Sequence, residues 1–196
     1  MKYSKNEVLI EVKDVNLSYD RPILRDINFQ IRNIVRPNIS QGQVISLIGR
    51  SGIGKTQLFK ILAGLIKPNS GTVNIGLDQH PVAAGDVSIV AQNYILFNHR
   101  TIYENFRLAI KHAAGSGLSE KAQKDLIEEY ASKFDLTDHL KKYPMQLSGG
   151  QRQRVSIIQQ VLTGNRFILF DEPFSGLDAL MIDKVIELLL QISTLH

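Results

Sequence analysis

The residues at positions 49–56, which read GRSGIGKT, constrain the fold more than any other part of this 196-residue chain. They fit the pattern G-x-x-x-x-G-K-[S/T] and lie between an apolar run at 44–48 and a helical pattern at 56–65. Glycines let the backbone curl so that successive N–H groups point at phosphate oxygens, and the following helix adds the positive end of its dipole. The segment therefore predicts a phosphate-binding loop that joins a strand buried on both faces to a helix.

The side chains of this loop match the needs of a nucleoside triphosphate and its metal ion. Lys55 is able to reach the β- and γ-phosphates as a mobile charge, and Thr56 offers its hydroxyl to Mg²⁺. A glycine-rich turn with an unrelated lysine is the alternative, but the motif and its context both argue against it. The residues expected to bind ATP here are Gly49, Arg50, Ser51, Gly52, Ile53, Gly54, Lys55, Thr56 and Gln57.

A second acidic element supports a nucleotide site. Positions 167–172 read FILFDE, an apolar strand that ends in two carboxylates. Such a strand places Asp171 at the carboxyl edge of the sheet, where it would hold Mg²⁺ through its water shell. Glu172, one residue further, would orient or deprotonate an attacking water. Alone, the pair could equally be a solvated acidic turn before Pro173, but the phosphate-binding loop favours the catalytic interpretation.

The remaining patterns predict an α/β fold in which a helical segment is inserted into a sheet core. The first third of the chain alternates at the strand period, and the composition becomes helical from about 101 to 165. Ser119 is the expected N-cap of one of these helices. We expect strands at 8–12, 15–19, 23–31, 44–48, 72–75, 87–90 and 167–170, and helices at 56–65, 118–134, 151–162 and 179–192.

Composition excludes several other classes of protein. The chain has no cysteine, which excludes disulfides, thiolate zinc sites and a cysteine nucleophile. Its 43% of apolar residues is ordinary for a globular protein, and the apolar runs are too short for a membrane span. The net charge of +4 suits an anionic ligand and does not require nucleic acid. The histidines, His139 among them, show no metal-ligand spacing, so we interpret them as surface or structural residues.

The pentapeptide LSGGQ at 147–151 resembles the signature sequence of the ABC-type ATPases. It follows the phosphate-binding loop, precedes the acidic strand and opens a helical pattern, which is the order found in that family. Tyr19 stands where the family has an aromatic platform for adenine, and Gln92 stands at the Q-loop position. The sequence SGLD at 175–178 looks like the D-loop, which contains Asp178. The resemblance covers nearly the whole chain.

This resemblance implies a P-loop NTPase core sheet with an N-terminal antiparallel β subdomain and an inserted α-helical subdomain. The single domain at 1–196 would divide into a core with its β subdomain, at 1–98 and 163–196, and a helical signature subdomain at 99–162. The family's pattern also implies that Gln92 senses Mg²⁺ and the attacking water. The expected catalytic residues are then Glu172, Lys55 and Gln92, and the expected metal ligands are Thr56, Gln92 and Asp171.

The resemblance further implies a composite ATP site shared by two subunits. Each subunit binds ATP on its own loop, and the signature of a second ABC ATPase subunit, identical or different, caps the γ-phosphate head to tail. Small residues at a helix N-terminus are suited to this because they present N–H and hydroxyl donors to an anion. The residues expected to act on the partner's ATP are Leu147, Ser148, Gly149, Gly150 and Gln151.

The implied function is the ATP-binding and ATP-hydrolysing subunit of a prokaryotic, importer-like membrane transporter. The transmembrane permease would be a separate chain, a solute-binding protein is a further expected partner, and the location would be the cytoplasmic face of the membrane. Two alternatives stay open: a non-transport ABC ATPase that acts on nucleic acid or the ribosome, and a regulatory module that binds ATP but hydrolyses it poorly. The stretch between Lys55 and Ser148 is too short for the long coiled coil of chromosome-structure members, which argues against nucleic acid.

The chain departs from the family's pattern at its end. The family continues after the D-loop helix with a strand and a histidine that contacts the γ-phosphate, whereas His196 directly follows the expected helix. We therefore do not assign His196 as that histidine. We expect a C-terminally truncated form that binds ATP and hydrolyses it poorly.

Overall fold

The computed structural model describes residues 4–35, 43–113, 117–174, 182–183, 186–187 and 189–190. The chain divides into two compact units, one formed by Met1–Asp86 with Asp183–His196 and the other by Val87–Ile182. Asp178 of the expected D-loop and most of the helix expected at 179–192 lie outside the described residues. Within the described ranges, no helix combines the length and the apolar composition needed to span a bilayer.

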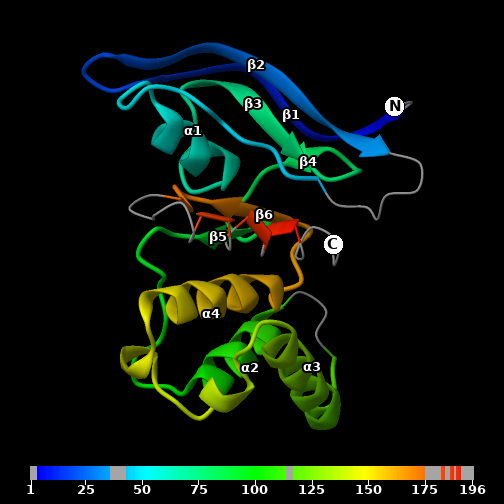
Figure 1. Cartoon of the computed structure of the whole chain (residues 1–196). Coiled ribbons are helices and arrows are strands. Elements are labelled where there is room, and N and C mark those ends of the chain that lie inside the picture. Colours follow the sequence, from blue (N-terminus) through cyan, green and yellow to red (C-terminus); the bar gives the residue numbers. More distant parts are fainter. Residues whose placement is uncertain are drawn as a thin grey trace. The chain divides into compact units, whose positions relative to one another are not determined.

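The first unit contains a four-stranded antiparallel sheet in the order β2-β1-β3-β4 (Figure 1). The long hairpin of β1 and β2 forms one side, and the first strand pairs with β3 on its other edge. The four strands are β1 (Ser4–Ser18), β2 (Pro22–Val35), β3 (Ser70–Ile75) and β4 (His80–Pro81).

A bulge explains why the sequence suggests two short strands where the structure has one. Ile10 and Val12 are buried at even positions of β1, whereas Val15 and Leu17 are buried at odd positions. Between them Asp14 has a positive φ of 51°, and the register with β2 shifts between Val12 and Val15. An extra residue in one strand changes which positions face the core, so β1 keeps a single apolar face across the irregularity.

The phosphate-binding loop leads into helix α1 (Lys55–Leu62), as predicted from the sequence. The helix ends two turns after it begins, and Gly64, with φ of 67°, follows its C-cap Ala63. Ile61 and Leu62 are buried, so the second turn of α1 packs into the unit while the first turn stays near the surface.

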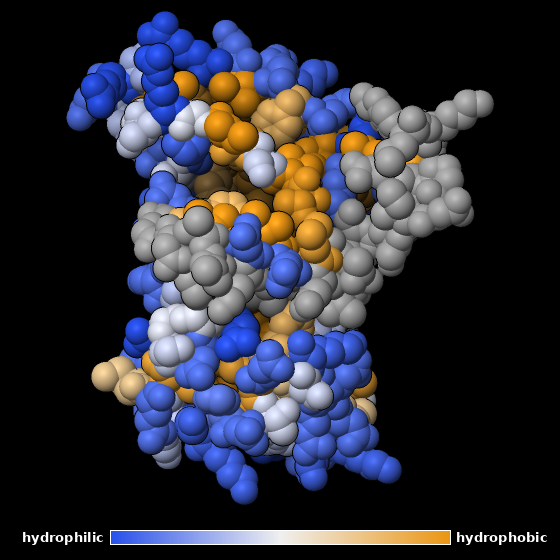
Figure 2. Space-filling model, in the orientation of Figure 1, coloured by the Kyte–Doolittle hydropathy of each residue, from blue (hydrophilic) through white to orange (hydrophobic). Residues whose placement is uncertain are grey.

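The prediction of a buried strand at 44–48 is wrong for this structure. Residues 43–50 form no strand, and the side chains of the apolar run are exposed, with Ile48 at 95%. An apolar run becomes a strand only if its backbone finds hydrogen-bond partners in a sheet. The segment 44–48 cannot pair with β1, because β2 and β3 already occupy both edges of that strand. Figure 2 shows apolar side chains on the surface of this unit. The exposed members of the run are Val44, Ile45, Leu47 and Ile48.

The second unit contains a parallel strand pair and a group of helices. β5 (Val87–Val90) pairs in parallel with β6 (Phe167–Phe170), and both strands match the predicted ranges. β6 is half-buried along its whole length. The helices are α2 (Ile102–His112), α3 (Glu120–Lys133) and α4 (Gly149–Val161), with short 3-10 helices η1 (Thr137–His139) and η2 (Pro144–Gln146).

One of these helices begins at the cap that the sequence predicts. Ser119 is the N-cap of α3 and accepts a hydrogen bond from the Ala122 N–H, as predicted. α4 begins at Gly149, two residues before the predicted start, because Ser148 caps it. α2, α3 and α4 share an apolar core, and their outer surface in Figure 2 is mainly hydrophilic. The fully buried core residues include Ile102, Phe106, Ile110, Ile127, Leu136, Val155, Ile157 and Ile158. The antiparallel sheet, the parallel pair and the four helices together make this an α/β P-loop NTPase fold.

Candidate functional site

The phosphate-binding loop has the backbone conformation that its glycines predict. Gly52 has φ of 79° and Gly54 has φ of 102°, both in the left-handed region that disfavours residues with a Cβ. Gly54 is the N-cap of α1, and no side chain caps the helix and no acidic residue lies in its first turn. The N–H groups at this helix start therefore keep their capacity for an anion. The rest of the loop is exposed, including Arg50, Ser51 and Ile53.

The ammonium group of Lys55 lies over this loop. Its Nζ donates hydrogen bonds of 2.9 Å to the Gly49 carbonyl and 3.0 Å to the Arg50 carbonyl. No carboxylate within the described ranges forms an ion pair with it. An ammonium group that is held by two loop carbonyls and has no carboxylate counter-ion among the described residues fits the triphosphate of a nucleotide.

Tyr19 lies beside the same loop. Its ring is 61% exposed, and its hydroxyl is 3.4 Å from Oε1 of Gln57 in the first turn of α1. Gly54 also approaches the start of β2, where an added Cβ would lie 2.9 Å from Cδ2 of Leu24. The hairpin between β1 and β2 thus brings Tyr19 next to the loop with most of the residue exposed, and its stacking on adenine stays a prediction.

The acidic residues and Gln92 lie at one edge of the parallel strand pair. Val90 of β5 pairs with Phe170 of β6, and the Asp171 N–H donates a 3.0 Å hydrogen bond to the Val90 carbonyl. Asp171 directly follows β6, and Gln92 follows β5 by two residues, so both leave the sheet at its carboxyl edge. Ligands of open α/β sheets bind at this edge.

Glu172 has a strained backbone at that edge. Its φ is 48°, which is uncommon for a residue with a long side chain, and the residue is exposed. Backbone strain of this kind costs about 1–3 kcal/mol and is concentrated at functional positions.

The donor atoms at this edge suit Mg²⁺. Carboxylate oxygens and amide oxygens are hard ligands, and Mg²⁺ commonly uses one or two carboxylates together with phosphates and water. Among the described residues no group of three or more histidine and carboxylate side chains is arranged to hold a metal alone. The carboxylate of Asp171 and the amide oxygen of Gln92 are donors of this kind, and the role of Thr56 as a metal ligand stays a prediction.

The signature sequence is open to the outside of its unit. Ser148 and Gly149 are exposed, and an added Cβ on Gly149 would meet no atom within 4 Å. Leu147 is buried and anchors the segment. The Ser148 hydroxyl accepts a hydrogen bond from the Gln151 N–H, so its own proton stays available for a phosphate oxygen.

Two residues to which the sequence analysis gave no role in the site support these segments. Nε2 of His139 lies 2.9 Å from Nε2 of Gln151, the last residue of the signature. Gln153 of α4 is buried and donates a 3.4 Å hydrogen bond to the Pro173 carbonyl, next to Glu172. The spacing of Ser148 and Gln151 is a capping-box signal that the sequence contains, whereas nothing local predicts the contact of His139.

Asn105 is a third residue that sequence reasoning missed. It is completely buried on α2, and its side chain accepts the Phe97 N–H at 2.9 Å. Its amide also donates to the carbonyls of Thr101 at 2.9 Å, Phe97 at 3.2 Å and Arg100 at 3.3 Å. Asn105 thus fixes the loop that continues the chain after Gln92.

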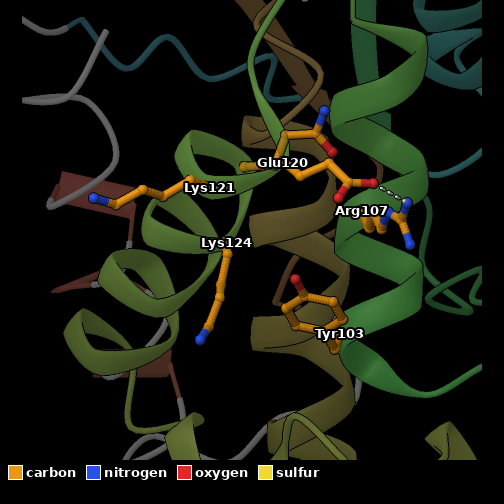
Figure 3. Close-up of a pocket in the computed structure, with 6 residues that line it drawn as sticks. Tyr103, Arg107, Glu120, Lys121 and Lys124 are labelled. Carbon is orange, nitrogen blue, oxygen red and sulfur yellow. Dashed lines mark hydrogen bonds and ion pairs between the residues drawn. The ribbon is translucent and has the colours of Figure 1, made fainter.

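A cleft of about 330 Å³ lies between α2 and α3 (Figure 3). Arg107 forms an exposed ion pair with Glu120 across it, with Nη2 and Oε1 separated by 3.4 Å. The cleft is lined by Tyr103, Arg107, Glu120, Lys121, Gln123 and Lys124, none of which is a predicted site residue.

The sequence is similar to a family whose description is ABC transporter, and the match covers residues 33–175. The spermidine/putrescine import ATP-binding protein PotA of Thermotoga maritima is 35% identical over 190 residues, which cover 95% of this chain and 48% of that protein. The sulfate/thiosulfate import ATP-binding protein CysA 1 of Agrobacterium fabrum is 35% identical over 175 residues, or 87% of this chain and 48% of that protein. The chain thus spans about half the length of the curated relatives it matches.

Solved structures give the same result for the fold. A structure described as the ATP binding subunit of an ABC transporter matches with a TM-score of 0.73 and 28% identity, covering 94% of this chain and 75% of that one. CbiO1 from Clostridium perfringens, described as part of the ABC transporter complex cbiONQ, matches with a TM-score of 0.78 and 23% identity. That match covers 96% of this chain and 74% of CbiO1. These comparisons support the transport interpretation over a role on nucleic acid.

Proposed function

The chain belongs to the ABC transporter family, and from that premise we propose that it is the ATP-binding and ATP-hydrolysing part of an importer-type membrane transporter. The observation that carries this proposal is the loop at 49–56, where glycines with positive φ and the Lys55 ammonium surround a helix start without a cap. Such a loop is suited to bind a triphosphate. Relatives of this chain are named as import ATP-binding proteins, which supports the proposal that the bound ATP powers import.

In the proposed reaction a water molecule attacks the γ-phosphate of ATP. Lys55 and the loop N–H groups hold the phosphates and neutralise their charge, and Tyr19 supports the adenine by stacking. Glu172 orients the water and accepts its proton, and Gln92 lies on the same edge to position it. Thr56, Asp171 and Gln92 would hold Mg²⁺, which when bound shields the charge that develops on the phosphates.

The signature completes this site in a partner subunit. Ser148 and Gly149 are exposed and lie at the start of α4, so a second copy or a related subunit could place its triphosphate against them. ATP bound on the loop of one subunit would then join the two subunits head to tail. Dimerisation and its release after hydrolysis would supply the motion that drives transport.

The segment after Gln92 offers a surface to a separate permease. Ile95 and Phe97 are 69% and 43% exposed, and Asn105 holds the loop that contains Phe97. Exposed apolar side chains on a fixed loop are typical of contact surfaces. Docking there would keep the chain at the cytoplasmic face of the membrane, and a solute-binding protein would deliver the cargo. The relatives are named for different cargoes, so the similarity points to no one substrate.

The variant Glu172→Gln tests the proposal. It keeps the shape of the side chain but removes the base, so MgATP binding measured by calorimetry should be unchanged while turnover falls by about 100-fold or more. Sedimentation should show a dimer that forms only with MgATP, because ATP is no longer consumed. Normal turnover in this variant would show that Glu172 is not the base, and failure to bind MgATP would refute the proposed function. Glu128→Gln, on the exposed face of α3, is the matched control.

A further inference from the structure

A short hydrogen-bonded chain of three residues links η1 to the signature. Nε2 of Gln151 lies 2.9 Å from Nε2 of His139, and Oε1 of Gln151 accepts the Ser148 N–H at 2.9 Å. The Gln151 N–H in turn donates to the Ser148 hydroxyl at 3.3 Å. The Gln151 side chain therefore touches the signature serine at one end and the imidazole at the other.

The direction of these hydrogen bonds fixes the role of the imidazole. Because a backbone N–H can only donate, the atom of Gln151 that faces Ser148 must be its carbonyl oxygen. The amide nitrogen then faces His139, and it too can only donate. Nε2 of His139 must accept, which places the imidazole proton on Nδ1. Nδ1 is buried and has no hydrogen-bond partner in the described part of the chain.

His139 is held firmly enough to act in this way. Its backbone N–H donates to the Leu136 carbonyl at 2.9 Å, and its carbonyl accepts the Lys142 N–H at 2.9 Å. Leu136 is itself fully buried. The imidazole of His139 is therefore carried by a hydrogen-bonded turn. Its Nε2 is the only side-chain partner of the Gln151 side-chain amide among the described residues.

We propose that His139 is a positioning residue for Ser148: as a neutral hydrogen-bond acceptor it orients the Gln151 amide, which holds the signature serine ready for the partner subunit's phosphate. This inference rests on the proposed function, because the signature acts only in the ATP-joined dimer. The residue needed at position 139 is one that accepts a hydrogen bond. A side chain of similar size that cannot accept should leave Gln151 free to rotate and Ser148 less well placed.

The test compares His139→Gln and His139→Met in the Glu172→Gln background. Glutamine restores an acceptor, whereas methionine fills similar space with only a weak one. The MgATP concentration that gives half-maximal dimer, measured by sedimentation, should rise by about 3- to 10-fold for His139→Met and stay near the parent value for His139→Gln. ATP binding to the monomer should be equal in all three, since His139 is not part of the phosphate-binding loop.

A second measurement keeps the inference testable if a variant folds poorly. Imidazole ¹⁵N NMR of the parent chain at alkaline pH should show the proton of His139 on Nδ1, with the resonance assigned by its loss in His139→Gln. A proton on Nε2, or equal dimerisation of the two variants, would overturn the role of His139. If the parent binds MgATP but forms no dimer, the proposed ATP-joined dimer fails, and the NMR result alone decides the orientation of Gln151.

Discussion

The Asp171 N–H donates to the Val90 carbonyl at 3.0 Å, which extends the pairing of β5 and β6 by one hydrogen bond past Phe170, the last residue of β6. The backbone that carries the Asp171 carboxylate is therefore fixed at the carboxyl edge of this strand pair, where Gln92 also leaves the sheet.

Lys55→Ala should weaken MgATP binding by about 10- to 100-fold, because it removes the charge-assisted contact with the phosphates. Calorimetry with MgATP measures this directly. Lys60→Ala is the matched control, since Lys60 lies in the last turn of the same helix and away from the loop. Equal binding by the two variants would mean that the ammonium over the loop has no part in holding the nucleotide.

Gly54→Ala should destabilise the protein and impair nucleotide binding. The residue has φ of 102°, and the new Cβ would lie 2.9 Å from the Leu24 side chain and 3.3 Å from the Ile23 carbonyl oxygen. Gly85→Ala is the matched control. Gly85 has a similar φ of 105° but nothing within 4 Å of an added Cβ, so this variant has the backbone strain without the steric contact. In urea unfolding, Gly54→Ala should lower the free energy of unfolding by about 1–2 kcal/mol more than Gly85→Ala does. Equal decreases in the free energy of unfolding would show that the contact of the new Cβ with β2 has no cost.

Asn105→Leu should lower the free energy of unfolding by about 2–3 kcal/mol, because it leaves backbone groups of the 97–101 loop without their buried partner. The loop should also become more sensitive to limited proteolysis than the rest of α2. Asn98→Leu, at an exposed position of the same loop, should have little effect on either measurement. If both variants unfold alike, the Asn105 side chain does not hold the loop.

His80 should make stability depend on pH. Its Nδ1 lies 2.9 Å from Asp78, and its Nε2 lies 3.2 Å from Asp86. The hydrogen bond to Asp78, followed by smaller effects of that charge and of Asp86, raises the pKa of His80 above 6.5. The same bond lowers the pKa of Asp78 below 3.8. The ion pair of His80 and Asp78 therefore contributes its full stabilisation at pH values between 3.8 and 6.5. This contribution is lost as the pH rises through the pKa that His80 has in the folded protein.

The melting temperature of His80→Gln should accordingly fall below that of the parent at about pH 5.5, and the difference should shrink by about pH 8.5. A difference that grows with pH would contradict the expected sign.

Local patterns in the sequence predict much of this structure. The left-handed glycines of the loop, the cap at Ser119 and the strands β5 and β6 each depend on neighbouring residues, and all agree with the structure. The strand expected at 44–48 was wrong because an apolar run does not specify which backbone it pairs with. The supporting roles of His139 and Asn105 depend on which helices and loops meet, which periodicity does not encode.

The bulge at Asp14 makes β1 tolerant of a deletion at one particular position. Because Asp14 is the extra residue, its removal would leave Val15 two positions after Val12, so Val15 and Leu17 would still face the core. A deletion elsewhere in this stretch, with the bulge retained, would reverse the faces of the strand that leads to Tyr19. Members of this family that lack the extra residue would show unbroken alternation through this stretch.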